Sequence, residues 1–260
     1  MDLELKDRTY LVTGGTAGLG LGIADVLARE GAHVAICGRD ADRLADAADM
    51  LRGHGGDVLA VRADVTRAED VDAVLTATGE RWGRLDGLVN NAGGNTATAF
   101  ADTSDEEWQA DFELKVLAAI RAVRTALPLL RRADRGASVI NVLSIFARSQ
   151  PSGSMPSSMF RSAGLALTKG LSNELAGDRI RVNALLVGFI RSAQWGRAAA
   201  REGVSQDRYE QARAEKLGIP LGRAGTTEEF ADLTAFVLSP RAGYLTGTAV
   251  NVDGGLSPVV

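Results

Sequence analysis

Strand-sized apolar runs alternate with helix-forming segments along the whole of this 260-residue chain. Strands separated by helices form βαβ units, whose crossovers are right-handed and whose strands are parallel. An α/β fold with one parallel sheet is therefore expected, and no change in composition marks a second domain. The expected strands are residues 9–12, 33–37, 58–61, 85–89, 138–142, 180–184 and 249–252, and the longest expected helices are residues 106–130 and 154–176.

The charge and the cysteine content argue against several classes of function. The formal net charge is −4, from 29 basic and 33 acidic residues without a like-charge block, so neither nucleic acid nor an anionic membrane is an expected partner. Cys37 is the single cysteine, and His33 and His54 are the only histidines, so no metal site is expected. No apolar run is long enough for a transmembrane helix, and residues 1–6 do not resemble a secretory signal. We therefore expect a cytoplasmic protein with a small-molecule substrate.

A glycine-rich segment, residues 13–20, separates the first expected strand from a helix. Glycines at this place let the backbone turn tightly and approach a pyrophosphate, to which the helix N-terminus offers its N–H groups. The position between strand and helix makes the motif more specific than glycines alone. The predicted cofactor contacts in this turn are Gly14, Thr16, Gly18, Leu19 and Gly20.

The end of the second strand indicates the type of dinucleotide. An acidic residue there would bind the adenosine ribose hydroxyls of NAD, but the chain has Gly38 followed by Arg39. A small residue and an arginine leave room and charge for a 2′-phosphate, so NADP(H) is favoured over NAD(H). The alternative is that Arg39 only begins the next helix. Asp64 and Val65, after the third strand, are predicted at the adenine edge, and the alternative for Asp64 is a place at the start of the following helix.

Further motifs follow in a fixed order. They are Asn90-Asn91-Ala92-Gly93 after the fourth strand, then residues 180–184, residues 220–223 and residues 251–255. Together with the turn at residues 13–20, they make nearly the whole chain similar to the short-chain dehydrogenase/reductases.

The resemblance implies a Rossmann-like, three-layer doubly wound sheet of about seven parallel strands, in one domain that covers residues 1–260. It also implies a homotetramer or a homodimer. Val187 replaces the proline that is usual before Gly188, which loosens that turn but leaves its backbone contacts possible. The residues that the resemblance places at the cofactor are Asn91, Ala92 and Gly93 after the fourth strand, and Gly188, Ile190 and Ser192 after the sixth.

The family carries a catalytic Ser, Tyr, Lys and Asn, and this chain keeps one of the four. Ser144 matches the serine, Ser157 stands at the tyrosine position and Arg161 stands at the lysine position. Lys115 stands at the asparagine position. No tyrosine occurs anywhere between Ser144 and Glu174.

These substitutions change how a proton can be delivered. Ser157 is too weak an acid to replace a tyrosine by ionising, although it can donate a hydrogen bond. Arg161 keeps its charge and can hold ribose hydroxyls, but its pKa is too high for proton delivery. Lys115, beside another cation and the nicotinamide, would have a lowered pKa and is the candidate general acid. The alternatives for Lys115 are a side chain that snorkels off its helix or one that binds backbone carbonyls.

The long polar segment of residues 188–222 is predicted to be a substrate lid, because it follows the carboxyl end of a strand. It is helix-prone around residues 206–216. Tyr209 either folds over the site or packs at its rim, and Trp195 either shapes a substrate pocket or anchors the loop.

These residues favour an NADP(H)-dependent oxidoreductase with non-standard proton delivery. Its hydride acceptor would be a carbonyl or, more readily, an activated C=C bond. The alternative is a catalytically silent NADP(H)-binding protein or partner subunit, since three catalytic positions are replaced. A lyase or isomerase that uses Lys115 as a base is a third possibility.

Overall fold

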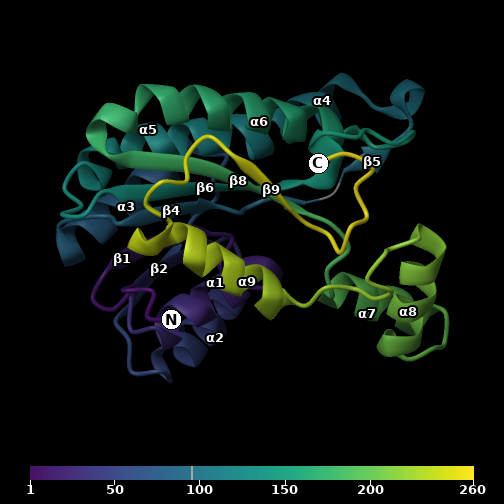
Figure 1. Cartoon of the computed structure of the whole chain (residues 1–260), viewed down its shortest axis with the longest axis horizontal. Coiled ribbons are helices and arrows are strands. Elements are labelled where there is room, and N and C mark those ends of the chain that lie inside the picture. The colour runs from purple at the N-terminus through teal and green to yellow at the C-terminus, as the bar shows by residue number, and fades with distance from the viewer. Residues whose placement is uncertain (95) are drawn as a thin grey trace.

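A seven-stranded parallel sheet lies between two layers of helices (Figure 1). The computed structural model describes residues 1–94 and 96–260. The strands of this sheet are β1 (Thr9–Thr13), β2 (His33–Gly38), β3 (Val58–Arg62), β4 (Gly87–Asn90), β6 (Ala137–Ser144), β8 (Ile180–Val187) and β9 (Ala249–Val252). They are arranged in the order β3-β2-β1-β4-β6-β8-β9. The predicted doubly wound α/β fold is therefore confirmed.

Helices cover both faces of this sheet. The α-helices of the described residues are α1 (Gly18–Arg29), α2 (Ala41–Arg52), α3 (Ala68–Trp82), α4 (Asp105–Phe112), α5 (Ala118–Leu130), α6 (Ser157–Glu174), α7 (Ala193–Arg201), α8 (Gln206–Leu217) and α9 (Thr227–Leu238). In Figure 1, α1, α2 and α9 lie on one face, α5 and α6 lie on the other, and α7 and α8 project beyond the sheet. Within residues 1–94 and 96–260, no helix combines the length and the apolar character needed to cross a membrane.

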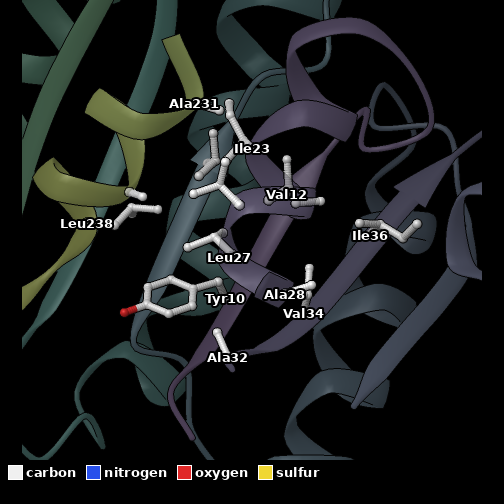
Figure 2. Close-up of a cluster of buried hydrophobic side chains, with 14 of the residues drawn as sticks. Tyr10, Val12, Ile23, Leu27, Ala28, Ala32, Val34, Ile36, Ala231 and Leu238 are labelled. Atoms are coloured by element: carbon white, nitrogen blue, oxygen red, sulfur yellow. The ribbon is translucent and has the colours of Figure 1, made fainter. Parts of the chain in front are cut away.

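Alternate side chains of β1 enter two different cores, as the two-residue period of a strand requires. Tyr10 and Val12 pack with Ile23 and Leu27 of α1 in the core that Figure 2 shows. Leu11 points the other way, into the core under α3 and α5. Burying an aliphatic side chain of this size contributes roughly 1.5–3 kcal/mol, so both cores hold β1 firmly. The turn at its carboxyl end is fixed as a result.

The strand order reverses between β1 and β4. The chain runs outward from β1 through β2 to β3, and then returns to β4 on the other side of β1. Val12 lies opposite Val89 in the register of these two parallel strands. The segments that follow β1 and β4 therefore emerge side by side, at the kind of crevice where open α/β sheets bind ligands.

The expected helix over residues 106–130 has an unbroken helical backbone, but its hydrogen-bond pattern changes within it. A π-helical turn, Glu113–Leu117, separates α4 from α5. Such turns insert an extra residue into a helix and occur frequently at functional sites. Lys115 lies in the middle of this turn, so its direction could not be read from a regular helical period.

The expected helix over residues 154–176 begins later, at Ser157. Pro156 disfavours helical backbone at the residue before it, which explains why Met155 stays outside the helix. Met155 and Pro156 form β7, which pairs antiparallel with β5 (Ala97–Thr98) in a small second sheet. The remaining short helices are Phe100–Asp102, Ile145–Ala147, Ala176–Asp178 and Pro240–Ala242.

Candidate active site

The glycine-rich turn after β1 is held in place by residues that follow β4. The Thr13 hydroxyl accepts hydrogen bonds from the backbone N–H groups of Asn91 and Ala92, at 3.0 and 3.1 Å. The Asn91 side-chain amide donates to the carbonyl oxygens of Thr13 and Gly14, at 3.0 and 3.3 Å. Gly20 passes so close to this turn that a Cβ would lie 2.2 Å from the Gly14 oxygen. The turn therefore leads rigidly into the N-terminus of α1, where free N–H groups can receive an anion.

The other predicted contacts of this turn lie where the motif requires them. Gly18 and Leu19 begin α1, and the backbone of Gly18 has a positive φ of 55°. A Cβ on Gly38, the last residue of β2, would lie 2.6 Å from the Thr16 methyl group. The turn and the end of β2 thus meet, as a dinucleotide that spans both would need.

Arg39 extends into solvent beside this junction. Its side chain is 80% exposed, and Nη1 lies 3.9 Å from an Asp64 carboxylate oxygen. Arg62, opposite Gly38 on β3, donates from Nε to the Arg39 carbonyl at 3.0 Å. The Arg39 guanidinium is therefore exposed and only loosely paired with Asp64, so that it can also meet a phosphate, while its backbone is held.

Asp64 has a structural task of its own. Its Oδ1 accepts from the Thr66 N–H and hydroxyl, at 3.0 and 2.8 Å, in the turn that leads to α3. This supports the alternative in which Asp64 organises the start of that helix. A contact between Asp64 and the adenine edge stays a prediction.

A cavity of about 30 Å³ lies among β1, β4, β6 and the helices α5 and α6. That volume accommodates roughly one or two water molecules. Lys115 and Arg161 both line it, as do Asn90, Ala92 and Val65. The structure thus brings together two of the predicted catalytic residues and two of the predicted cofactor contacts.

Lys115 points inward and forms a buried ion pair with Asp111, one turn earlier on α4. Each of the two side chains is only 2% exposed, which excludes a lysine that snorkels into solvent. Burial lowers the pKa of Lys115; the Asp111 carboxylate opposes this shift and the Arg161 guanidinium adds to it. The predicted proximity to a second cation is present, and so is an anion that the sequence interpretation overlooked.

Arg161 reaches β6 from the first turns of α6. Its Nη1 donates to the Val142 carbonyl at 2.8 Å, and its buried Nε has no hydrogen-bond partner among the described residues. A Cβ on Gly93 would lie 3.4 Å from Nη2. Burial lowers the pKa of this guanidinium, and the Asp111 carboxylate opposes that shift.

Ser144 and Ser157 are not joined to these two cations. The Ser144 hydroxyl accepts a hydrogen bond from the Phe146 N–H at 3.3 Å, at the carboxyl end of β6. Ser157 is buried at the first position of α6. In the part of the chain that the structure describes, neither hydroxyl is hydrogen-bonded to Lys115 or Arg161.

The segment after β8 has its own anchors. A Cβ on Gly188 would lie 2.4 Å from the Asp253 Cβ, and the Gly188 N–H donates to the Val252 carbonyl at 3.0 Å. Ile190 forms an isolated bridge with Gly225. Ser192 precedes α7, a helix that the sequence interpretation did not expect.

Trp195 anchors this segment. Its Nε1 donates to the Ile190 carbonyl at 3.1 Å, and its ring lies 5.1 Å from that of Phe189. Tyr209, on α8, stacks on Trp195 with a centroid distance of 6.4 Å. The arrangement supports the anchoring alternative for Trp195 and the packing alternative for Tyr209.

A chain of hydrogen-bonded polar side chains runs along the wall of the cavity, and the sequence interpretation missed two of its members, Asn141 and Thr168. Asn90 Nδ2 donates to Asn141 Oδ1 at 2.9 Å, and Asn141 Nδ2 donates to the Thr168 hydroxyl at 2.9 Å. Asn141 interrupts the apolar run of residues 139–143 in β6, which was the available signal. The chain ties β4, β6 and α6 together around Lys115 and Arg161.

Comparisons with known proteins agree with this geometry. A family model described as enoyl-(acyl carrier protein) reductase matches residues 14–257. The 3-oxoacyl-[acyl-carrier-protein] reductase FabG of Chlamydia pneumoniae is 33% identical over 258 residues, which are 99% of this chain and 100% of that protein. The chain belongs to the short-chain dehydrogenase/reductases.

Two solved structures of this family are also similar. L-sorbose reductase from Gluconobacter frateurii, complexed with NADPH and L-sorbose, is 34% identical with a TM-score of 0.94, and the match covers 100% of both chains. An NADPH-bound short-chain oxidoreductase from Pseudomonas aeruginosa PAO1, described as containing an atypical catalytic center, is 34% identical with a TM-score of 0.93. That match covers 98% of this chain and 100% of the other.

Family membership confirms the resemblance that the motifs indicated. In this short-chain dehydrogenase/reductase, Lys115 and Arg161 line the same cavity. Among the described residues, the hydroxyls of Ser144 and Ser157 are not hydrogen-bonded to either of these side chains. The roles of these four residues in catalysis stay predictions.

Proposed function

We propose that this chain is an NADP(H)-dependent reductase that transfers hydride to a carbonyl or an activated C=C bond, with Lys115 as the candidate proton donor and Arg161 as a fixed charge beside it. The observation that carries the proposal is the cavity shared by these two cations, next to the clamped glycine turn. Two cations buried together repel each other and favour negative charge beside them. Negative charge that develops on a substrate oxygen would be stabilised there.

The residues that would hold NADP(H) fit the cofactor. Because Gly20 has no Cβ, the Gly14 carbonyl oxygen can lie directly against it. The turn can therefore stay tight beside a pyrophosphate. Arg39 is exposed at the end of β2, where a 2′-phosphate would lie. Two similar structures contain NADPH, which supports the same cofactor here. When bound, the cofactor supplies the hydride.

The residues of this chain would then manage charge and protons. Arg161 carries a permanent charge and would hold ribose hydroxyls or the substrate oxygen. Lys115, with a pKa lowered by burial, would stabilise that oxygen or give it a proton. Ser144 can donate a further hydrogen bond from the end of β6. Reduction of a C=C bond suits this set well, since an enolate oxygen needs stabilisation while water can protonate carbon.

The test is a spectroscopic assay with NADPH and NADH against panels of enoyl thioesters, enones, ketones and sugars. We expect NADPH oxidation with at least one substrate, a preference for NADPH over NADH, and loss of turnover in Arg161→Met. Tight NADPH binding without oxidation by any panel would contradict the proposal.

The separation of Ser144 and Ser157 from the cations favours a second candidate, a catalytically silent NADP(H)-binding protein. The triple variant Lys115→Asn, Ser157→Tyr and Arg161→Lys distinguishes the two. Ketone reduction by this variant, where the parent reduces nothing, would indicate an intact scaffold whose chemistry was lost. The segment of residues 188–222 is proposed as the substrate lid, and truncation of α8 should then change KM far more than NADPH affinity.

We also infer a homotetramer or homodimer, by analogy with the family. Light scattering coupled to size exclusion measures this directly, and a monomer at all concentrations would refute it.

A further inference from the structure

Asp111 is the buried anion of the site, and its position is unusual for a residue of α4. The sequence of this helix, Asp105-Glu106-Glu107-Trp108-Gln109-Ala110-Asp111-Phe112, is typical of a solvated surface helix. Asp111 is nevertheless the one residue of α4 that is fully buried, at 3% exposure. A buried carboxylate is costly unless it is paired, so its location needs an explanation.

The ion pair with Lys115 accounts for one of the two carboxylate oxygens of Asp111. Oδ1 accepts from the Lys115 ammonium across one turn. Oδ2 is buried without a hydrogen-bond partner among the described residues. One carboxylate oxygen is thus committed to the lysine, and the other remains able to accept.

Asp111 also acts on the second cation of the site. Among the described residues, the charged groups that act on Lys115 are Asp111 from α4 and Arg161 from α6, and the group that acts on Arg161 is again Asp111. One carboxylate therefore offsets two positive charges, the Arg161 guanidinium and the Lys115 ammonium, in a small buried volume. Removing it would leave two like charges facing each other.

The packing of α4 against α6 fixes where this carboxylate lies. Trp108 and Phe112, on either side of Asp111 in the helix, both contact Phe160, with ring centroids 5.8 and 5.7 Å apart. Phe160 directly precedes Arg161. These contacts hold the Asp111 face of α4 toward Arg161, while the π-helical turn carries Lys115 to the same side.

We propose that Asp111 is a positioning residue that supplies the counter-charge for Lys115 and holds its ammonium inside the cavity beside Arg161. The inference rests on the proposed reductase function, because it assigns Asp111 a task in keeping the candidate proton donor charged. Without the carboxylate, burial and Arg161 would both favour the neutral amine. An uncharged amine can neither protonate an oxyanion nor stabilise it by charge.

The variant Asp111→Asn tests this with little change in shape, because the amide oxygen can still accept from Lys115. We expect the pH above which reduction fails to fall by about one to three units, the usual effect of one nearby opposite charge. Activity at low pH should be largely retained. Asp105→Asn removes the same charge from the exposed first turn of α4 and should leave the pH profile in place. A uniform loss of rate at every pH would instead indicate a structural role and overturn the proposal.

A second measurement does not depend on turnover. The chain has only four lysines, Lys6, Lys115, Lys169 and Lys216, so lysine labelled with ¹³C at Cε gives four resolvable NMR signals. The signal missing from Lys115→Arg identifies Lys115, and its midpoint in the parent should lie about one to three pH units above that in Asp111→Asn. Equal midpoints would overturn the inference, as would a parent lysine that is already neutral at pH 7. If the midpoints differ but no substrate oxidises NADPH, the reductase proposal fails while the ion-pair assignment stands.

Discussion

A Cβ added to Gly20 would lie 2.2 Å from the carbonyl oxygen of Gly14. Gly20→Ala must therefore shift either α1 or the glycine-rich turn. Overpacking of this kind costs about 1–3 kcal/mol, and a displaced turn should weaken NADPH binding roughly tenfold or more. Isothermal calorimetry and thermal unfolding measure the two effects. Gly170→Ala is the matched control, because that glycine lies on α6 with open space around it and the substitution should stabilise the helix by up to about 1 kcal/mol. Unchanged NADPH affinity in Gly20→Ala would show that the turn is not the phosphate site.

Arg39→Ala should separate the two nicotinamide cofactors. A charge-assisted hydrogen bond to a phosphate is worth about 1.5–3 kcal/mol, so the Kd for NADPH should rise roughly ten- to a hundredfold. The Kd for NADH should not change. Arg43→Ala, on the neighbouring exposed turn of α2, controls for general loss of positive charge. Equal weakening of both cofactors would contradict a 2′-phosphate contact.

Lys115→Arg keeps the charge beside Asp111 but removes an amine that can release a proton. Single-turnover hydride transfer should slow by about 10²-fold or more, since general acid catalysis contributes that much, while NADPH binding persists. Stopped-flow fluorescence of NADPH follows both steps. Lys169→Arg, at an exposed position of α6, should behave like the parent. A full rate in Lys115→Arg would leave Lys115 with a purely electrostatic task.

Glu229 should contribute to stability in a defined pH window. Its hydrogen bond to Arg223 and the one to the Thr226 N–H lower the pKa of Glu229 from 4.5 to about 2. Because the folded-state pKa lies below the unfolded value, the stabilisation is complete above pH 4.5 and is lost as the pH falls toward 2. The side chain is 47% exposed, so we expect Glu229→Gln to cost less than about 1 kcal/mol at neutral pH. Urea unfolding at pH 7, 5 and 3 should show this difference shrink, whereas Glu228→Gln should give no such trend.

The strands and the cofactor turn could be predicted because they depend on local patterns. A largely apolar segment such as residues 138–142 within β6 must be buried between two helical layers, and a strand of the central sheet meets that requirement. The turn at residues 13–20 needs glycines for steric reasons that any sequence must obey. Helix ends near Met155 could have been placed better, since Pro156 was visible in the sequence.

The charged part of the site could not be predicted in the same way. Asp111 and Lys115 have the spacing of an ordinary exposed ion pair, and only the packing of Phe160 on Trp108 and Phe112 turns that face inward. The spacing of apolar residues over 106–130 did not indicate the π-helical turn. Burial of a carboxylate is a property of the assembled layers and not of the segment that contains it.

The segment that begins at Gly188 has a small interior of its own. Phe189, Ala214 and Ile219 are buried together, in a cluster distinct from the cores on the two faces of the sheet. A piece with separate packing can be exchanged between relatives, or remodelled by mutation, without disturbing the half of the molecule that carries the glycine-rich turn. A change of substrate preference through this segment therefore need not destabilise the part of the molecule that carries the glycine-rich turn.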